Sequence, residues 1–157
     1  MEGENLLYLK RYPEALQKYQ AAWERSPTFF EAYQKGSQLL ITQGRLSEAE
    51  TLIQKGKSAV LPIKKQYAVD FAWLLSSIYL KEGRFEEASQ EFQVVEQGAT
   101  EVFKKGSYFL EMEEKVDFVR KQLPLKMNIQ KEILPSPLNG FALQYFPVLT
   151  ADGKQLF

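Results

Sequence analysis

A six-residue motif occurs three times along the chain, at residues 10–15, 44–49 and 83–88. Each copy ends in Glu-Ala, and a large apolar residue follows that alanine four positions later. The first two alanines are 34 residues apart and the last two are 39 apart. Recurrence near 34 residues is typical of arrays of stacked helix pairs, because one pair cannot bury its apolar face alone. The motif therefore predicts an all-α array of at least six antiparallel helices over residues 2 to about 97.

Over this region the pattern resembles the tetratricopeptide repeat. The resemblance rests on the motif alanines Ala15, Ala49 and Ala88, and on the apolar residues that follow them, Tyr19, Ile53 and Phe92. It implies a right-handed superhelix of antiparallel helix pairs, whose concave face binds a protein partner or a peptide segment. The resemblance therefore favours a non-enzymatic protein–protein interaction scaffold.

Helix start and stop signals divide the array. Ser47 to Glu50 fits a capping box, in which two side chains satisfy free backbone donors. The third motif comes five residues later than a 34-residue period would place it. This excess falls within residues 63–68, and we expect it to lengthen the helix that follows. The first three predicted helices run from Pro13 to about Ser26, from a Ser26-Pro27 cap to about Gln43, and from Ser47 to about Leu61. Pro62 interrupts the pattern, a longer helix follows to Glu82, and the last runs from Phe85 to about Gln97.

Small residues recur where paired helices are expected to cross, because they let two backbones approach to roughly 8–10 Å. Trp23 continues the apolar stripe of Tyr19 and is predicted to lie in the core. The small residues expected at the crossings are Ala15, Ser37, Ala49, Ser76 and Ala88.

The composition argues against most catalytic and nucleic-acid-binding functions. The chain has 20 basic and 20 acidic residues, which leaves no basic face for nucleic acid. It contains no histidine and no cysteine, so common general bases and metal ligands are missing. No apolar run reaches the roughly 18 residues that a membrane span needs. The acidic residues at 111–117 are interpreted as a solvated helix face. We therefore predict no enzyme activity, cofactor or metal site.

The candidate binding surface is the inward face of the first helix of each pair. Trp73 stands out there, because tryptophan is enriched among interface anchors. The equally weighted alternative is that Trp73 packs against a neighbouring helix or the tail. The predicted partner-binding residues are Gln34, Gln38, Ile41, Asp70, Trp73, Ser77 and Lys81.

One known use of this repeat is disfavoured. Tetratricopeptide co-chaperones hold a C-terminal carboxylate with Lys, Asn and Arg side chains. The residues that match this clamp are Glu4, Lys35, Asp70 and Leu74. Two acids and a leucine cannot supply the cationic donors that a carboxylate needs, so carboxylate-clamp recognition is not expected.

The composition changes after residue 123. We expect a tetratricopeptide-repeat domain with C-terminal cap helices at 1–123, a linker at 124–141 rich in proline, and a β segment at 142–157. The last segment reads as strand, Asp-Gly turn and strand. Two strands alone are marginal, which predicts a truncated β domain that packs internally or mediates self-association.

Residues 145–157 resemble the opening of a TolB-like, PD40-type β-propeller blade. The order of repeats, cap, linker and blade resembles Bacteroidota envelope proteins that end in an OmpA-like domain, some implicated in type IX secretion. This resemblance implies a periplasmic, outer-membrane-associated protein. The alternative is a general adaptor, cytoplasmic or otherwise, that binds a peptide in its concave groove.

Overall fold

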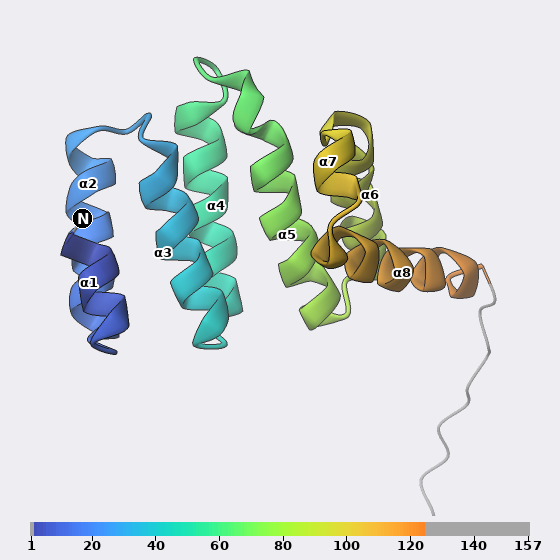
Figure 1. The fold of residues 1–157 in the computed structure, drawn as a ribbon, viewed down its shortest axis with the longest axis horizontal. Helices are drawn as coiled ribbons and strands as arrows, with labels where there is room; N and C mark the ends of the chain where they lie inside the picture. Colours follow the sequence, from blue (N-terminus) through green and yellow to red (C-terminus); the bar gives the residue numbers. More distant parts are fainter. Residues whose placement is uncertain (1, 125–157) are drawn as a thin grey trace, which may run out of the picture. The chain divides into compact units, whose positions relative to one another are not determined.

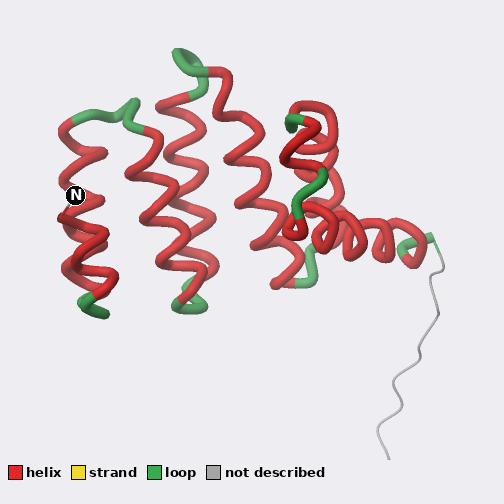
Figure 2. Tube along the Cα trace, viewed as in Figure 1, coloured by secondary structure: helices red, strands yellow, loops and turns green. Residues whose placement is uncertain are grey.

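The computed structural model describes residues 2–124, and all of its regular structure there is helical (Figures 1 and 2). The predicted linker, β segment and tail-mediated self-association lie outside the described residues. The elements are α1 (Glu2–Tyr8), α2 (Tyr12–Arg25), α3 (Phe30–Thr42), α4 (Leu46–Val60), the 3₁₀ turn η1 (Lys65–Tyr67), α5 (Ala68–Glu82), α6 (Phe85–Gly98), α7 (Glu101–Lys104) and α8 (Ser107–Gln122).

Helices α1 to α6 form the predicted array. Each packs against the next along the chain, and α3 also contacts α5, so first helices of adjacent pairs meet. Figure 1 shows these helices side by side, running alternately up and down. The all-α fold of antiparallel helix pairs is confirmed.

The three motifs adopt one geometry. In each, a residue with positive φ precedes an arginine: Lys10 at 56°, and Gly44 and Gly83 at 73°. The arginine N–H donates back to the preceding helix, and its carbonyl accepts from the motif alanine N–H at 3.0 Å in every copy. The expected small residues Ala15, Ser37, Ala49, Ser76 and Ala88 are all fully buried.

An arginine, and not a serine, begins each second helix. Arg45 is the N-cap of α4, and its side chain binds Glu48 at 2.6 and 2.7 Å. Arg11 pairs with Glu14 through two hydrogen bonds in the same way, whereas Arg84 donates to Glu87 through Nε alone. The predicted capping box at Ser47 is therefore wrong, because the N-cap of α4 is Arg45, two residues earlier. The hydrogen bond from Arg45 lowers the pKa of Glu48.

Two further boundaries differ from the prediction. The extra residues at 63–68 do not lengthen the next helix as predicted, since α5 takes only Ala68 from this range and residues 65–67 form η1. Lys64, with φ −128° and ψ 72°, breaks the helical path after Pro62. Helix α3 begins at Phe30 without a side-chain cap, because the chain first makes a turn from Ser26 to Phe29.

The core lies between the helix pairs. Trp23 is 7% exposed and stacks on Tyr33 with ring centroids 5.5 Å apart, which confirms its core position. Phe71 of α5 is fully buried and meets Phe30 of α3 edge-on at 5.1 Å. The first contact joins α2 to α3, and the second joins α3 to α5, which are the first helices of adjacent pairs.

Two interior glycines make the close packing around α4 possible. A Cβ on Gly56 would lie 2.8 Å from Tyr33 Cγ and 2.9 Å from Phe71 Cε1. A Cβ on Gly36 would lie 3.0 Å from atoms of both Leu52 and Trp23. Both positions therefore need glycine for space, although glycine weakens a helix interior by about 1 kcal/mol relative to alanine.

Helices α7 and α8 cap the array. Helix α8 packs on α6 and runs across the direction of the repeat helices (Figure 1). Arg120 anchors it: its guanidinium donates to Glu96 at 2.8 and 2.9 Å and to Ser89 Oγ at 2.8 Å. Pairing with Glu96 raises the pKa of Arg120.

The backbone at Lys10 gives a direct test of the motif geometry. A side chain at positive φ costs roughly 1–2 kcal/mol, partly offset by the greater unfolded-state freedom of glycine. Lys10→Gly should therefore raise the free energy of unfolding by about 0.5–1 kcal/mol. The reciprocal Gly44→Lys should lower it, although no atom lies within 4 Å of a Cβ there. Urea titration measures both changes, and the same sign for both would contradict the motif geometry.

Candidate interaction groove

A groove opens on the side of the array lined by the first helices, and we call it the inner groove. It encloses about 470 Å³ between α3, the start of α5 and the connection from α6 to α7. Its lining residues are Gln34, Gln38, Gln66, Val69, Asp70, Trp73, Leu74, Gly98, Ala99, Thr100 and Phe103.

Helical spacing places the polar groups of the groove. Gln34 and Gln38 are four residues apart on α3, and Asp70 and Trp73 are three apart on α5, so each pair shares a helix face. The far wall comes from the cap, where Thr100 accepts a hydrogen bond from the Phe103 N–H at 3.3 Å and starts α7. Gly98 lets this wall approach α5, because a Cβ there would lie 2.5 Å from Val69 Cγ2.

Trp73 packs against the cap and lines the groove at once. Its ring meets Phe103 edge-on at 5.2 Å, and lies 6.4 Å from Phe92 and 6.5 Å from Phe109. The side chain is half-buried. Part of the Trp73 ring thus packs against neighbouring helices, as the alternative prediction had it. The rest of the side chain lines the groove, where a partner could contact it.

Asp70 is the one ionisable side chain among the described residues that line the groove. It is half-buried and forms no ion pair with any residue between 2 and 124. Burial raises the pKa of its carboxyl group, since water solvates the charge poorly there. The groove therefore presents a carboxylate that no lysine or arginine among its lining residues neutralises.

The structure brings together four of the seven predicted site residues: Gln34, Gln38, Asp70 and Trp73. Ile41 instead packs against the core, Ser77 is half-buried and Lys81 is exposed, and none of the three lines the groove. These three residues lie closer to the C-terminal ends of α3 and α5, whereas the groove lies nearer the start of α5. The sequence prediction missed the lining residues Gln66, Val69, Thr100 and Phe103, because η1 and the folding back of α7 were not foreseen.

The residues that match the carboxylate clamp do not form one. Asp70 and Leu74 line the groove, whereas Lys35 does not. The groove thus presents a carboxylate where a clamp needs a cationic donor.

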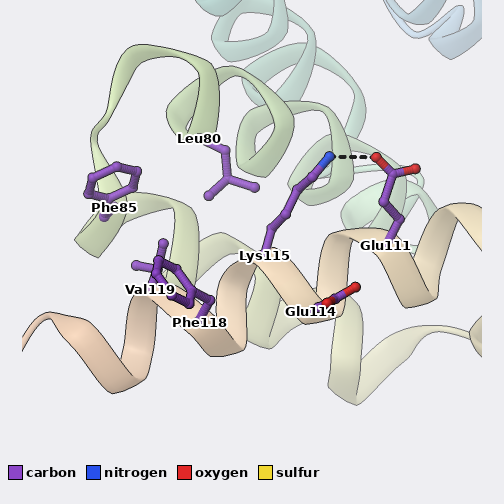
Figure 3. A pocket seen from close by; sticks show the side chains of 7 residues that line it. All are labelled: Leu80, Phe85, Glu111, Glu114, Lys115, Phe118 and Val119. Atoms are coloured by element: carbon purple, nitrogen blue, oxygen red, sulfur yellow. Dashed lines mark hydrogen bonds and ion pairs between the residues drawn. The ribbon is translucent and has the colours of Figure 1, made fainter.

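A second hollow of about 590 Å³ lies between the turn joining α5 to α6 and helix α8 (Figure 3). Leu80 and Phe85 face Phe118 and Val119 there, and Lys115 pairs with Glu111 at 2.5 Å. Phe118 is 63% exposed. This hollow is larger than the inner groove, but its charged rim is partly neutralised within α8 and it offers fewer polar groups of different kinds.

The acidic residues of α8 are exposed or half-buried. Glu111 pairs with Lys115, and Asp117 lies 3.5 Å from Arg120. Between residues 2 and 124, no group of three or more acidic, histidine or cysteine side chains could hold a metal ion. None of the helices in that range has the length and hydropathy to cross a bilayer.

The described region is a helical-repeat array with a groove on the side of its first helices. Residues 6–60 match the tetratricopeptide repeat family model, and this match extends from α1 through α4. Residues 6–60 thus belong to a tetratricopeptide repeat domain, and α5 and α6 follow them as a further helix pair joined by the same kind of turn. No curated protein matches the chain.

Proposed function

We propose that this chain is a non-enzymatic scaffold that binds a segment of a partner protein in the inner groove. Tetratricopeptide repeats are generally protein–protein interaction modules, and they are typically non-catalytic. The observation that carries the proposal is the convergence of glutamine amides, an unpaired carboxylate and an aromatic pair in one groove.

These groups suit an extended segment. The amides of Gln34 and Gln38 each supply donors and an acceptor, which match the N–H and C=O groups of a backbone without β-sheet partners. Trp73 and Phe103 offer an apolar surface of the kind that interface anchors use. A segment lying along α3 and α5 could therefore contact amides and aromatic rings together.

Substitution of Gln38 tests the groove with little risk to the fold, because its side chain is exposed. We expect Gln38→Lys to reduce recovery of partners by purified protein at least about tenfold, since the lysine places bulk and charge in the groove. Trp73→Ala is a less selective test, because its loss also disturbs the contacts with Phe103 and Phe109.

Gln54→Lys is the matched control, since Gln54 is exposed on α4 and lies outside the groove. Partners recovered by the wild type and by Gln54→Lys, but not by Gln38→Lys, would support the proposal. Equal recovery by all three proteins, with unchanged circular dichroism, would rule out the groove as the binding site.

We also propose that the scaffold acts in the periplasm, associated with the outer membrane. Support for this comes from the resemblance of residues 145–157 to a propeller blade opening, and propeller, OmpA-like and secretion functions rest on that resemblance alone. Fractionation of cells that express the native protein tests the proposal. Recovery with the outer membrane is expected, and recovery with the cytosol would favour the general adaptor.

A further inference from the structure

The charge of the inner groove indicates what kind of segment it binds. Its described lining contains one carboxylate and no lysine or arginine. Asp70 has no ion-pair partner from residue 2 to residue 124, although it is half-buried. A carboxylate in that setting gains most from a partner that brings a positive charge and hydrogen-bond donors.

The neighbours of Asp70 narrow the choice of cation. Asp70 and Trp73 share one face of α5, where residues three apart have Cβ atoms about 5–6 Å from each other. A planar guanidinium can donate two hydrogen bonds to a carboxylate while it stacks on an aromatic ring, and an ammonium cannot do both as well. We infer that the inner groove selects a protein segment that carries an arginine, held between the Asp70 carboxylate and the Trp73 ring.

This inference rests on the proposed function, because it assigns a specificity to the same groove. Gln34 and Gln38 lie across the groove on α3 and would bind the backbone on either side of the arginine. Phe103 contacts the Trp73 ring edge-on and holds it in place. The recognition would thus combine a sequence-independent contact with the peptide backbone and a charge-specific contact at one side chain.

Random peptide libraries that differ only in one central residue can test the inference. The central residue is arginine, lysine, glutamine or glutamate, and binding to the full chain is measured by fluorescence anisotropy of labelled peptides. We expect the arginine library to bind best and the glutamate library worst. Asp70→Asn should weaken arginine-library binding about tenfold, to the level of the glutamine library, because charge-assisted hydrogen bonds are lost.

Glu86→Gln is the matched control, because Glu86 is an exposed acid in the first turn of α6 and lies outside the groove. It should leave the library order unchanged. Asp70→Lys should invert the order, so that the glutamate library binds better than the arginine library. This gain of binding cannot arise from a variant that fails to fold.

Two contrary results have different meanings. If all four libraries bind equally and Gln38→Lys abolishes that binding, the arginine specificity is wrong and the groove remains the binding site. If no library binds, or if Gln38→Lys changes nothing, the proposed function of the groove fails together with the inference.

Discussion

Replacing Phe71 with alanine should lower the free energy of unfolding by about 3–5 kcal/mol, the range for deleting a buried phenylalanine ring. Phe71 is fully buried, and its ring meets Phe30 edge-on at 5.1 Å. The same Phe30 also stacks on Tyr67 of η1, with ring centroids 4.0 Å apart. Loss of the Phe71 ring therefore also weakens the support of η1. The cavity would lie between two helix pairs.

Urea denaturation followed by circular dichroism measures this change. Repeat arrays are stabilised by contacts between neighbouring units, so a weakened junction should also broaden the transition or split it into two steps. Val102→Ala is the control, because Val102 is 84% exposed and its loss should change stability by less than about 0.5 kcal/mol. A loss below about 1 kcal/mol for Phe71→Ala would contradict the assigned core.

Gly56→Ala should destabilise the protein by about 1–3 kcal/mol, although alanine is the better helix former by about 1 kcal/mol. The new methyl group would lie 2.8 Å from Tyr33 Cγ and 2.9 Å from Phe71 Cε1. Both rings are almost fully buried, so neither can move aside without disturbing the packing of α3 and α5 against α4.

Ser58→Ala on the same helix is expected to change the stability of the protein in the opposite direction. Ser58 is exposed, and its hydroxyl only donates to the Gln54 carbonyl, so alanine should stabilise the helix slightly. Thermal melts of the two variants separate crowding from helix propensity. Stabilisation by both substitutions would show that Gly56 has room for a methyl group.

The turns that join the two helices of each pair, which we call corners, could be predicted because the residues that determine each turn are close together in the sequence. Gly44 and Gly83 mark the turns, and the alanines that follow mark the crossings, all within a few residues. The capping box was mispredicted because Ser47 and Glu50 fit a general pattern, whereas Arg45 and Glu48 make the contacts that start the helix. The motif arginines recur three times, and that recurrence was the signal for their role.

The inner groove was predictable only in part. Helical spacing was sufficient to place Gln34, Gln38, Asp70 and Trp73 on the inward face. Thr100 and Phe103 reach the same groove because α7 folds back toward α5, which depends on contacts between residues far apart in the sequence. Gly56 carried a signal that the sequence prediction did not use, since a glycine inside a helical pattern often has a packing reason.

The corner geometry described above has a consequence for how such a chain can change over evolutionary time. A positive-φ residue, an N-cap arginine and a glutamate three positions later specify each corner within one contiguous stretch. A duplicated or deleted gene segment of one repeat length would therefore carry its own corner with it, and only the contacts to the adjoining repeats would need to adapt. The length of the array, and with it the reach of the groove, can thus vary in whole repeats while each corner folds as before.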